Sequence, residues 1–262
     1  MSNEGAEAAQ LIVFARVPQL GQVKSRLAAD LGPTRALAVY RSLLNATLAT
    51  VAQFAQQAPP ARLNLNSHSH SHLNLHLNLH LNLQLHLCFA GDDSQRELAD
   101  LAQRHRMTLS QQAGGNLGDR MASALNAALT RGTPAVLIGT DLPTLGPYHL
   151  RWAFDALTVA DAAFVPVEDG GYGLVGLTRP ADSIFADIAW STDQVMRQTR
   201  ERMVQMGLSW REGEILWDVD TRANLARWQL IEGTGEGLRT GLSDRLIDDL
   251  SDGLSDSERH HS

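Results

Sequence analysis

The chain has 262 residues, of which 44% are hydrophobic and 19% charged, a composition typical of a globular domain. Its formal net charge is −7, and the stretch from Glu236 onward carries more than half of that charge. The sequence has no basic stripe, so binding to nucleic acid through its phosphates is disfavoured. Any phosphate that this chain binds must therefore meet local basic residues.

The N-terminal stretch and the cysteine content favour a cytoplasmic protein without membrane contact. The sequence MSNEGAEAAQLIVFARVPQ lacks the basic region of a signal peptide, and its apolar run is far shorter than the roughly 18 residues that cross a bilayer. The single cysteine, Cys88, excludes an internal disulfide framework and a zinc cluster built from cysteines.

The first half of the chain alternates buried strands with helices. The run LIVFA at 11–15 is continuously apolar, which is typical of a buried parallel strand. A second such run, AVLIG at 135–139, predicts another. Apolar residues at three- and four-residue spacing predict helices between them, and these cover 23–31, a longer segment from Pro33, 94–105 and 117–129.

The second half predicts a hairpin and a late strand. Strands at 162–167 and 172–177 flank the turn EDGG, and Asp-Gly is a strong hairpin signal. We expect helices at 148–157 and, starting from a capping box of Ser191 and Gln194, up to about 206. A strand is expected at 214–219. The pattern predicts an α/β fold: one three-layer α/β/α domain whose sheet is mostly parallel.

We expect this domain to span 11–232, after a flexible N-terminus at 1–10. Residues 63–87 are a low-complexity stretch of His, Asn and Leu, and 233–262 form an acidic, low-complexity tail in which Leu-Ser-Asp occurs three times.

The loop after the first strand is a candidate phosphate site. Lys24 is the only lysine among 22 basic residues, and its ammonium group binds phosphate as a point charge. Gly21 permits close approach of the backbone, and Arg26 lies near the start of the following helix. This loop matches neither GxxxxGK[ST] nor GxGxxG. The alternative is a plain turn followed by a helix with solvated basic residues.

Carboxylates follow three further strands, at the edge where open α/β sheets bind ligands. Asp141 is suited to hold Mg²⁺ or Mn²⁺ against a diphosphate. Asp169 lies in the hairpin turn, and Asp218 and Asp220 lie two residues apart, so they point to one side and complete the metal site. The alternatives are turn formation for Asp141 and Asp169, and helix capping for Asp220.

Six sequence blocks in matching order resemble one family. They are FARVPQLGQVKSRL, GNLGDRM, IGTDLPTL, PVEDGGYGLVGL, IAWSTDQV and WDVDTRANL, and they span about 11–228. They resemble the bacterial GT-A-fold glycosyltransferase-like family associated with arsenosugar biosynthesis. That family is related to nucleotide-diphospho-sugar transferases and to 2-phospholactate and molybdenum-cofactor guanylyltransferases. The resemblance implies the GT-A type of fold and a transferase activity.

The resemblance also implies a set of site residues. The implied nucleotide- and phosphate-binding residues are Arg16, Gly21, Lys24, Arg26, Gly118 and Arg120. A divalent metal is implied on Asp141, although the DxD motif of many GT-A enzymes is reduced here to Thr140-Asp141. The implied acceptor region comprises Asp169, Gly170, Gly171 and Tyr172.

Two transferase reactions remain open. In glycosyl transfer from a nucleotide-diphospho-sugar, Asp169 activates a hydroxyl of a small acceptor as general base while Lys24 stabilises charge on the leaving diphosphate. In nucleotidyl transfer, a small phosphorylated acceptor attacks the α-phosphate. The loop GxGxRMxxxK of sugar nucleotidyltransferases is absent, which favours glycosyl transfer. A non-catalytic nucleotide-binding module is an alternative of another class.

The stretch 63–87 holds six of the ten histidines and is the basis for a further alternative, a metal-binding protein. His68, His70 and His72 would share one face of an extended strand. No Asp or Glu lies among them to orient the imidazole rings. We interpret the stretch as a tandem expansion of a strand that ends at LCFAG, and not as the functional site.

Overall fold

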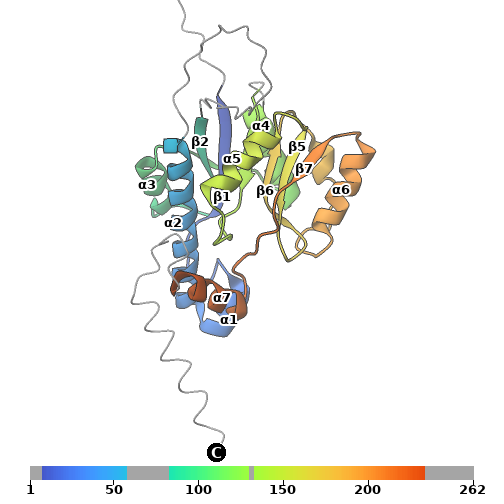
Figure 1. Cartoon of the computed structure of the whole chain (residues 1–262). Coiled ribbons are helices and arrows are strands. Elements are labelled where there is room, and N and C mark those ends of the chain that lie inside the picture. The colour runs from blue at the N-terminus through green and yellow to red at the C-terminus, as the bar shows by residue number, and fades with distance from the viewer. Residues whose placement is uncertain (1–7, 58–82, 130–132, 234–262) are drawn as a thin grey trace, which may run out of the picture.

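A central sheet of seven strands runs through the computed structural model, which describes residues 8–57, 83–129 and 133–233 (Figure 1). The strands are β1 (Ala9–Arg16), β2 (Leu83–Ala90), β3 (Thr108–Gln111), β4 (Ala135–Ile138), β5 (Ala162–Pro166), β6 (Tyr172–Leu177) and β7 (Trp210–Glu212). They lie in the order β3-β2-β1-β4-β6-β5-β7. Only β6, among these strands, is antiparallel to its neighbours. The predicted mostly parallel sheet with one hairpin is confirmed.

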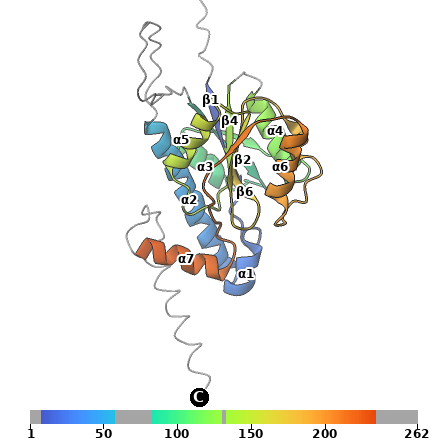
Figure 2. The same cartoon turned by 45° about the vertical axis from the view of Figure 1, so that its right-hand side comes forward.

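Helices cover both faces of this sheet. They are α1 (Ser25–Leu31), α2 (Pro33–Gln57), α3 (Glu97–Arg104), α4 (Leu117–Leu129), α5 (Pro147–Ala156), α6 (Val195–Gln205) and α7 (Arg222–Gly233), with a 3₁₀ turn, η1 (Asp182–Phe185). Figure 2 shows α2 and α5 on one side of the sheet and α4 and α6 on the other. The predicted three layers are therefore present.

The central strand β1 shows why the sheet is buried on both faces. Leu11 and Val13 pack with residues of α2, α3 and α5, whereas Ile12 and Phe14 pack with residues of α4 and α6. A strand that is covered on both sides needs apolar residues at successive positions, which is the pattern read from LIVFA.

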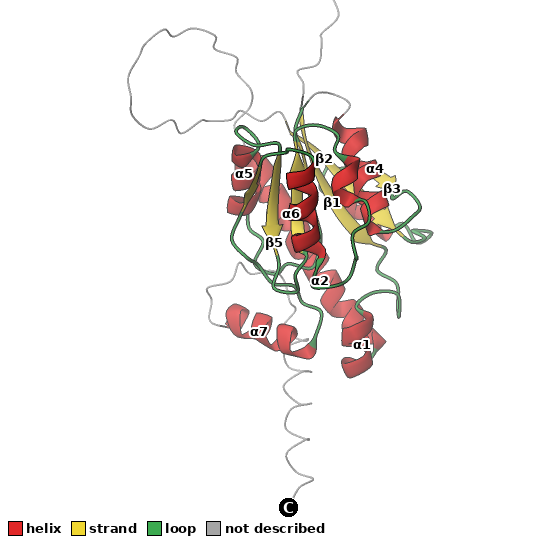
Figure 3. Cartoon of the chain, turned by 90° about the vertical axis from the view of Figure 1, so that its right-hand side faces the viewer, coloured by secondary structure: helices red, strands yellow, loops and turns green. Residues whose placement is uncertain are grey.

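A third, smaller apolar cluster joins α1 and the start of α2 to α7. Figure 3 shows α1 and α7 at the same end of the molecule. The cluster consists of Leu27, Ala36, Val39, Leu43, Trp217, Val219, Leu225 and Trp228. It ties the loop that carries Lys24 to the segment that carries Asp218, although the two lie far apart in the sequence.

The predicted capping box before α6 is wrong. Ser191 has a positive φ of 64°, and α6 begins only at Val195, after Gln194, whose side chain makes no capping hydrogen bond. Thr192 forms the local turn instead, because its hydroxyl donates to the carbonyl of Ala189 and accepts from the amide of Gln194.

The predicted strand at 214–219 is also largely wrong. Only Leu216 pairs there, in an isolated bridge to Val167, whereas the ladder of β7 lies at 210–212. Strand β3 was not predicted, because TLSQ lies at an edge of the sheet, is mostly exposed and shows no apolar alternation.

The repetitive histidine stretch contributes to the described structure only through residues 83–87, which begin β2 between β1 and β3. The predicted strand ending at LCFAG is confirmed. His68, His70 and His72 lie outside the described residues, as do 1–7 and the tail at 234–262. Within the described ranges, no helix is long and apolar enough to cross a membrane.

Candidate functional site

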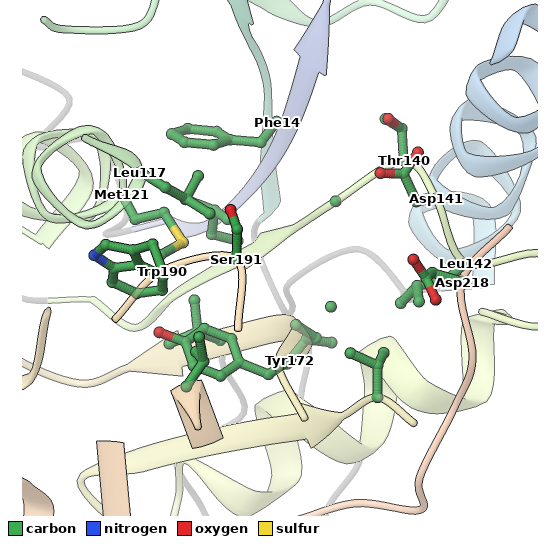
Figure 4. A pocket seen from close by; sticks show the side chains of 18 of the residues that line it. Phe14, Leu117, Met121, Thr140, Asp141, Leu142, Tyr172, Trp190, Ser191 and Asp218 are labelled. Carbon is green, nitrogen blue, oxygen red and sulfur yellow. The ribbon is translucent and has the colours of Figure 1, made fainter. Parts of the chain in front are cut away.

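A cavity of about 420 Å³ lies where β1, β4 and β5 end and β6 begins. This is the edge of the sheet at which ligands were expected. The cavity has two chemically different ends (Figure 4). Apolar side chains gather at one end, whereas Asp141 and Asp218 lie at the other. The apolar side chains are those of Phe14, Leu117, Met121 and Trp190.

Arg16 and Arg120 line this cavity, and neutral groups anchor the side chain of Arg120. The guanidinium group of Arg120 donates to the side-chain oxygen of Gln112 at 3.2 Å and to the carbonyl of Asn116 at 3.2 Å. Burial and the positive charge of Arg16 lower the pKa of Arg120. Neither Arg16 nor Arg120 forms a salt bridge with a carboxylate of the described residues.

Gln112 was not identified from the sequence, yet it connects three elements around the arginines. Its side-chain amide donates to the carbonyls of Ala15 and Cys88, at 3.2 and 3.1 Å, while its oxygen accepts from Arg120. It therefore fixes Arg120 against the ends of β1 and β2. A glutamine in a polar loop carries no sequence signal for such a role.

Tyr40 anchors the backbone at Arg16. Its hydroxyl accepts from the amide of Arg16 at 2.7 Å and donates to the carbonyl of the same residue at 2.9 Å. Burial is the main reason that the pKa of Tyr40 is raised to about 12. The hydroxyl therefore stays protonated and satisfies both backbone groups. Tyr40 appeared in the sequence only as one apolar position of a helix.

Lys24 and Asp141 form an ion pair, with 2.6 Å between the ammonium nitrogen and a carboxylate oxygen. The side chain of Lys24 is only 5% exposed, whereas that of Asp141 is 49% exposed and lines the cavity. Lys24 has a left-handed backbone, with φ of 50°, at the start of α1. The lone lysine and the predicted metal ligand are thus in direct contact.

Asp218 and Asp169 also line the cavity. Burial and the negative charge of Asp169 raise the pKa of Asp218, and the positive charge of Lys24 partly opposes this. Asp169 lies in the turn between β5 and β6, where its carboxylate accepts from the amide of Gly171 at 2.8 Å. Carboxylates from two separate segments therefore face one space.

Arg26 and Asp220 are brought together, but they do not line the cavity. They pair with each other at 3.1 Å, and the side chain of Arg26 is 71% exposed. The predicted cap of α7 is provided by Thr221 instead of Asp220, because the Thr221 hydroxyl accepts from the amide of Asn224 at 3.2 Å. Asp220 and Arg26 therefore link the first loop to the last segment of the domain.

The glycines of the predicted site have different surroundings. Gly21 has a positive φ of 76° and open space around it. A Cβ at Gly118 would lie 2.6 Å from the ring of Trp190, and a Cβ at Gly170 would lie 2.3 Å from the carbonyl oxygen of Asp193. Gly118 and Gly170 are thus required by packing, and of the four predicted glycines only Gly171 lines the cavity.

Tyr172 lines the cavity between its two ends (Figure 4). Its ring makes edge contacts with Phe164 and Trp190, at centroid distances of 5.2 and 6.3 Å. Burial raises the pKa of Tyr172, so its hydroxyl is not an acid or base at neutral pH. Its contribution to the cavity is the apolar ring.

The fit of a divalent cation rests on Asp141 and Asp218. Within the described ranges, no three His, Cys, Asp or Glu side chains lie close enough to form a metal cluster by themselves. Magnesium commonly takes one or two carboxylates and completes its coordination with water and substrate phosphates. Two carboxylates at one end of an open cavity fit a cation that arrives with a diphosphate.

A sequence model of one family matches residues 74–192. The family is described as an uncharacterized protein conserved in bacteria (DUF2064). The match includes Gln112, Arg120, Asp141 and Asp169. No curated protein matches the chain.

Solved structures share the fold. One from Desulfovibrio desulfuricans G20, provisionally assigned as a nucleotide-diphospho-sugar transferase, is 24% identical with a TM-score of 0.72, and the match covers 92% of this chain and 94% of that one. A 4-diphosphocytidyl-2C-methyl-D-erythritol synthase from Anaerococcus prevotii DSM 20548 is 8% identical with a TM-score of 0.53, over 87% and 99%. At these identities the similarity shows the fold alone. The GT-A type expected from the sequence is confirmed.

Proposed function

We propose that this chain is a glycosyltransferase that uses a nucleotide-diphospho-sugar donor with the assistance of Mg²⁺ or Mn²⁺. One observation carries the proposal. A single cavity has an apolar end and two arginines without carboxylate partners among the described residues, and it has carboxylates at its other end. Each part of such a donor has matching groups in this cavity: apolar walls for a flat base, arginines for a diphosphate, and carboxylates for a metal ion and a polar sugar.

The apolar end is suited to the base of the nucleotide. Leu117, Met121 and Trp190 offer an aromatic ring and aliphatic contacts, and pockets for flat ligands combine such walls with few polar groups. Arg16 and Arg120 are suited to the diphosphate, because a guanidinium fork matches the geometry of phosphate oxygens. Neutral groups anchor the guanidinium group of Arg120, and neither arginine pairs with a carboxylate of the described residues, so both charges are available.

The carboxylate end is suited to the transfer itself. When bound, a divalent cation would neutralise charge on the diphosphate, and Asp141 and Asp218 would hold it. The Lys24 ammonium group, at 2.6 Å from Asp141, keeps a positive charge beside the same phosphates. Asp169 would take the proton from the acceptor hydroxyl as general base. The role of each of these residues is part of the proposal.

The test is incubation of the protein with Mn²⁺ and a panel of nucleotide sugars and nucleoside triphosphates. We expect release of a nucleoside diphosphate from one nucleotide sugar, with loss of release in Lys24→Ala and Asp141→Ala. Arg197→Ala, which removes an exposed ion pair within α6, is the matched control and should behave like the unmodified protein. Release of pyrophosphate would instead indicate nucleotidyl transfer. Binding without turnover would indicate a nucleotide-binding module.

The association with arsenosugar biosynthesis comes from the sequence blocks alone and stays a prediction. This association concerns the acceptor, which the donor screen does not identify. The donor must be identified first, because acceptors can be compared only with a known donor.

A further inference from the structure

We propose that Gly139 sets the size of the group that this cavity accepts beside the diphosphate, and that this group is the ribose of the donor. The inference rests on the proposed function and names a residue that determines the donor specificity of the same site. It follows from the space around this glycine and from its place between the two ends of the cavity.

Gly139 lies at a part of the cavity that is open to a ligand. It directly follows β4 and lines the cavity. Apart from its two chain neighbours, the described residues place only one heavy atom within 4 Å of a Cβ at Gly139, the carbonyl oxygen of Gly173 at 3.9 Å. The backbone of Gly139 does not have a positive φ, so other residues can adopt it. Neither packing nor backbone conformation therefore requires a glycine here.

The other two glycines that line the cavity, within the described ranges, differ from Gly139. A Cβ at Gly173 would lie 2.2 Å from the side chain of Leu142, and a Cβ at Gly171 would lie 3.2 Å from the carboxylate of Asp169. At those two positions the protein itself occupies the space. Of the three glycines, only Gly139 would send a new side chain into the open cavity.

The open space at Gly139 faces the helix that carries part of the apolar end. Leu137, two residues earlier, packs with residues of α4, whereas Ile138 packs with residues of α2 and α5. Side chains alternate between the two faces of a strand, so a side chain at Gly139 would point to the same face as Leu137. Helix α4 covers that face, and its Leu117 and Met121 line the cavity. The space therefore opens toward residues that are suited to the base.

Gly139 also lies between the two ends of the cavity. Strands β1 and β4 pair in parallel with Val13 beside Ile138, and the same register places Phe14 beside Gly139, about 4.8 Å away. Phe14 belongs to the apolar end (Figure 4). Asp141, at the carboxylate end, follows Gly139 by two residues, which is at most about 7 Å along the chain.

The ribose is the part of a nucleotide that joins the base to the diphosphate. It must cross the stretch over Gly139 if the base lies at the apolar end and the diphosphate meets a metal ion on Asp141. A bare backbone leaves room for this ring, and binding sites packed as closely as protein interiors respond to each added methyl group. The transferred sugar is attached beyond the diphosphate, so it would not lie over Gly139.

The first test adds carbon atoms at Gly139 in two steps. UDP, GDP and ADP are titrated with Mn²⁺ into the unmodified protein, and the nucleoside diphosphate that binds is then used for Gly139→Ala and Gly139→Val. We expect its Kd to rise by about 10-fold for the alanine variant and by about 100-fold for the valine variant, the range that overpacking produces. An unchanged Kd in both variants would overturn the inference.

Matched variants at Gly114 separate the loss of ribose binding from a loss of the fold. Gly114 also has no positive φ and no heavy atom within 4 Å of an added Cβ, but it does not line the cavity. Gly114→Ala and Gly114→Val should therefore keep the Kd of the unmodified protein. The unfolding midpoint of Gly139→Ala should stay equal or rise, because alanine restricts the unfolded chain more than glycine does. Equal losses of binding at both positions, or a lower unfolding midpoint in Gly139→Ala, would contradict the inference.

A second test identifies the group that lies over Gly139. Inorganic diphosphate has no ribose, so its Kd in the presence of Mn²⁺ should change by less than about twofold in Gly139→Val, as for independent sites. The Kd values of the nucleoside diphosphate and of its nucleotide sugar should rise by the same factor. Weaker binding of the nucleotide sugar alone, or of inorganic diphosphate to the same degree, would overturn the inference. An unmodified protein that binds inorganic diphosphate but no nucleotide would overturn the proposed function as well.

Discussion

The two ends of the cavity hold their charged groups in opposite ways. On α4, which also carries Leu117 and Met121 of the apolar end, the guanidinium group of Arg120 is fixed by a glutamine oxygen and a backbone carbonyl, so its positive charge is not cancelled. At the other end, the positive charge of Lys24 is already paired with Asp141. Positioning by neutral groups leaves a full charge for a ligand, whereas an ion pair with a carboxylate of the protein offsets part of that charge.

Asp141→Ala should have the largest effect, because it removes the group that contacts Lys24 and that would hold a metal. We expect kcat to fall by about 10²- to 10³-fold, the range seen when one stabilising electrostatic group is lost from an active site. The measurement is the release of nucleoside diphosphate at saturating donor and Mn²⁺. Lys24 would be left buried without its partner, so the unfolding midpoint is recorded in parallel. A variant that folds normally and keeps full activity would contradict the role of this end.

Arg120→Gln should mainly weaken donor binding, because it removes one positive charge that neutral groups position. We expect the Kd for the nucleoside diphosphate to rise by about 10- to 100-fold, as for a charge-assisted hydrogen bond to phosphate worth about 1.5–3 kcal/mol. Calorimetric titration provides the value. The control is Arg179→Gln, whose exposed side chain pairs with Asp161 away from the cavity. Equal losses in both variants would show that the position of Arg120 is unimportant.

Several site residues could be predicted because they directly follow strands. The end of β4 and the hairpin turn are readable as apolar runs followed by polar residues, and Asp141 and Asp169 line the cavity. Arg16 also lines the cavity, but only the family resemblance implied it. The same reasoning also selected Arg26 and Asp220, which pair with each other instead. Sequence position indicates the edge of the sheet, but it does not indicate which side chain turns inward.

Tyr40→Phe tests whether the backbone anchor of Arg16 matters. The variant leaves the amide and the carbonyl of Arg16 without their hydroxyl partner, so we expect stability to fall by about 1–3 kcal/mol. The Kd for the nucleoside diphosphate should rise by about 10-fold, less than for Arg120→Gln, since the guanidinium group remains. Tyr148→Phe, on an exposed tyrosine, is the matched control for chemical denaturation and calorimetry. Unchanged binding in Tyr40→Phe would show that this anchor of the Arg16 backbone does not support donor binding.

The fold was more accessible from the sequence than the supports of the site. Buried strands such as β1 have a strong signal, a continuous apolar run, because both of their faces are covered. Amphipathic helices such as α2 also have a strong signal, a periodic apolar stripe, because one of their faces is covered. Gln112 and Trp190 gave no such signal: their roles depend on contacts with segments distant in the sequence. The short edge strand β3 was missed for a related reason, since exposed polar residues do not reveal pairing.

Gly118→Ala should have a moderate effect on the apolar end. The added methyl group would lie 2.6 Å from the ring of Trp190, so the ring must move. We expect the free energy of unfolding to fall by about 1–2 kcal/mol. The steric overlap destabilises the fold more than the higher helix propensity of alanine stabilises it. The donor Kd should rise a few-fold, measured with the unfolding midpoint. Gly114→Ala has no heavy atom within 4 Å of its new Cβ and should change neither quantity. If the two variants had the same donor Kd, the position of the Trp190 ring would not affect donor binding.

Deletion of residues 64–82 should have the smallest effect on either end of the cavity. The deleted segment lies outside the described residues and stops before β2, whose Leu83–Ala90 remain to pair with β1 and β3. Because every residue that lines the cavity is retained, the donor Kd should change by less than about twofold. Retention of Ni²⁺ or Zn²⁺ by the His-rich stretch should disappear at the same time, since six histidines become one. Loss of donor binding with the histidines would mean that the two ends of the cavity do not form the site by themselves, and that the repetitive stretch belongs to it.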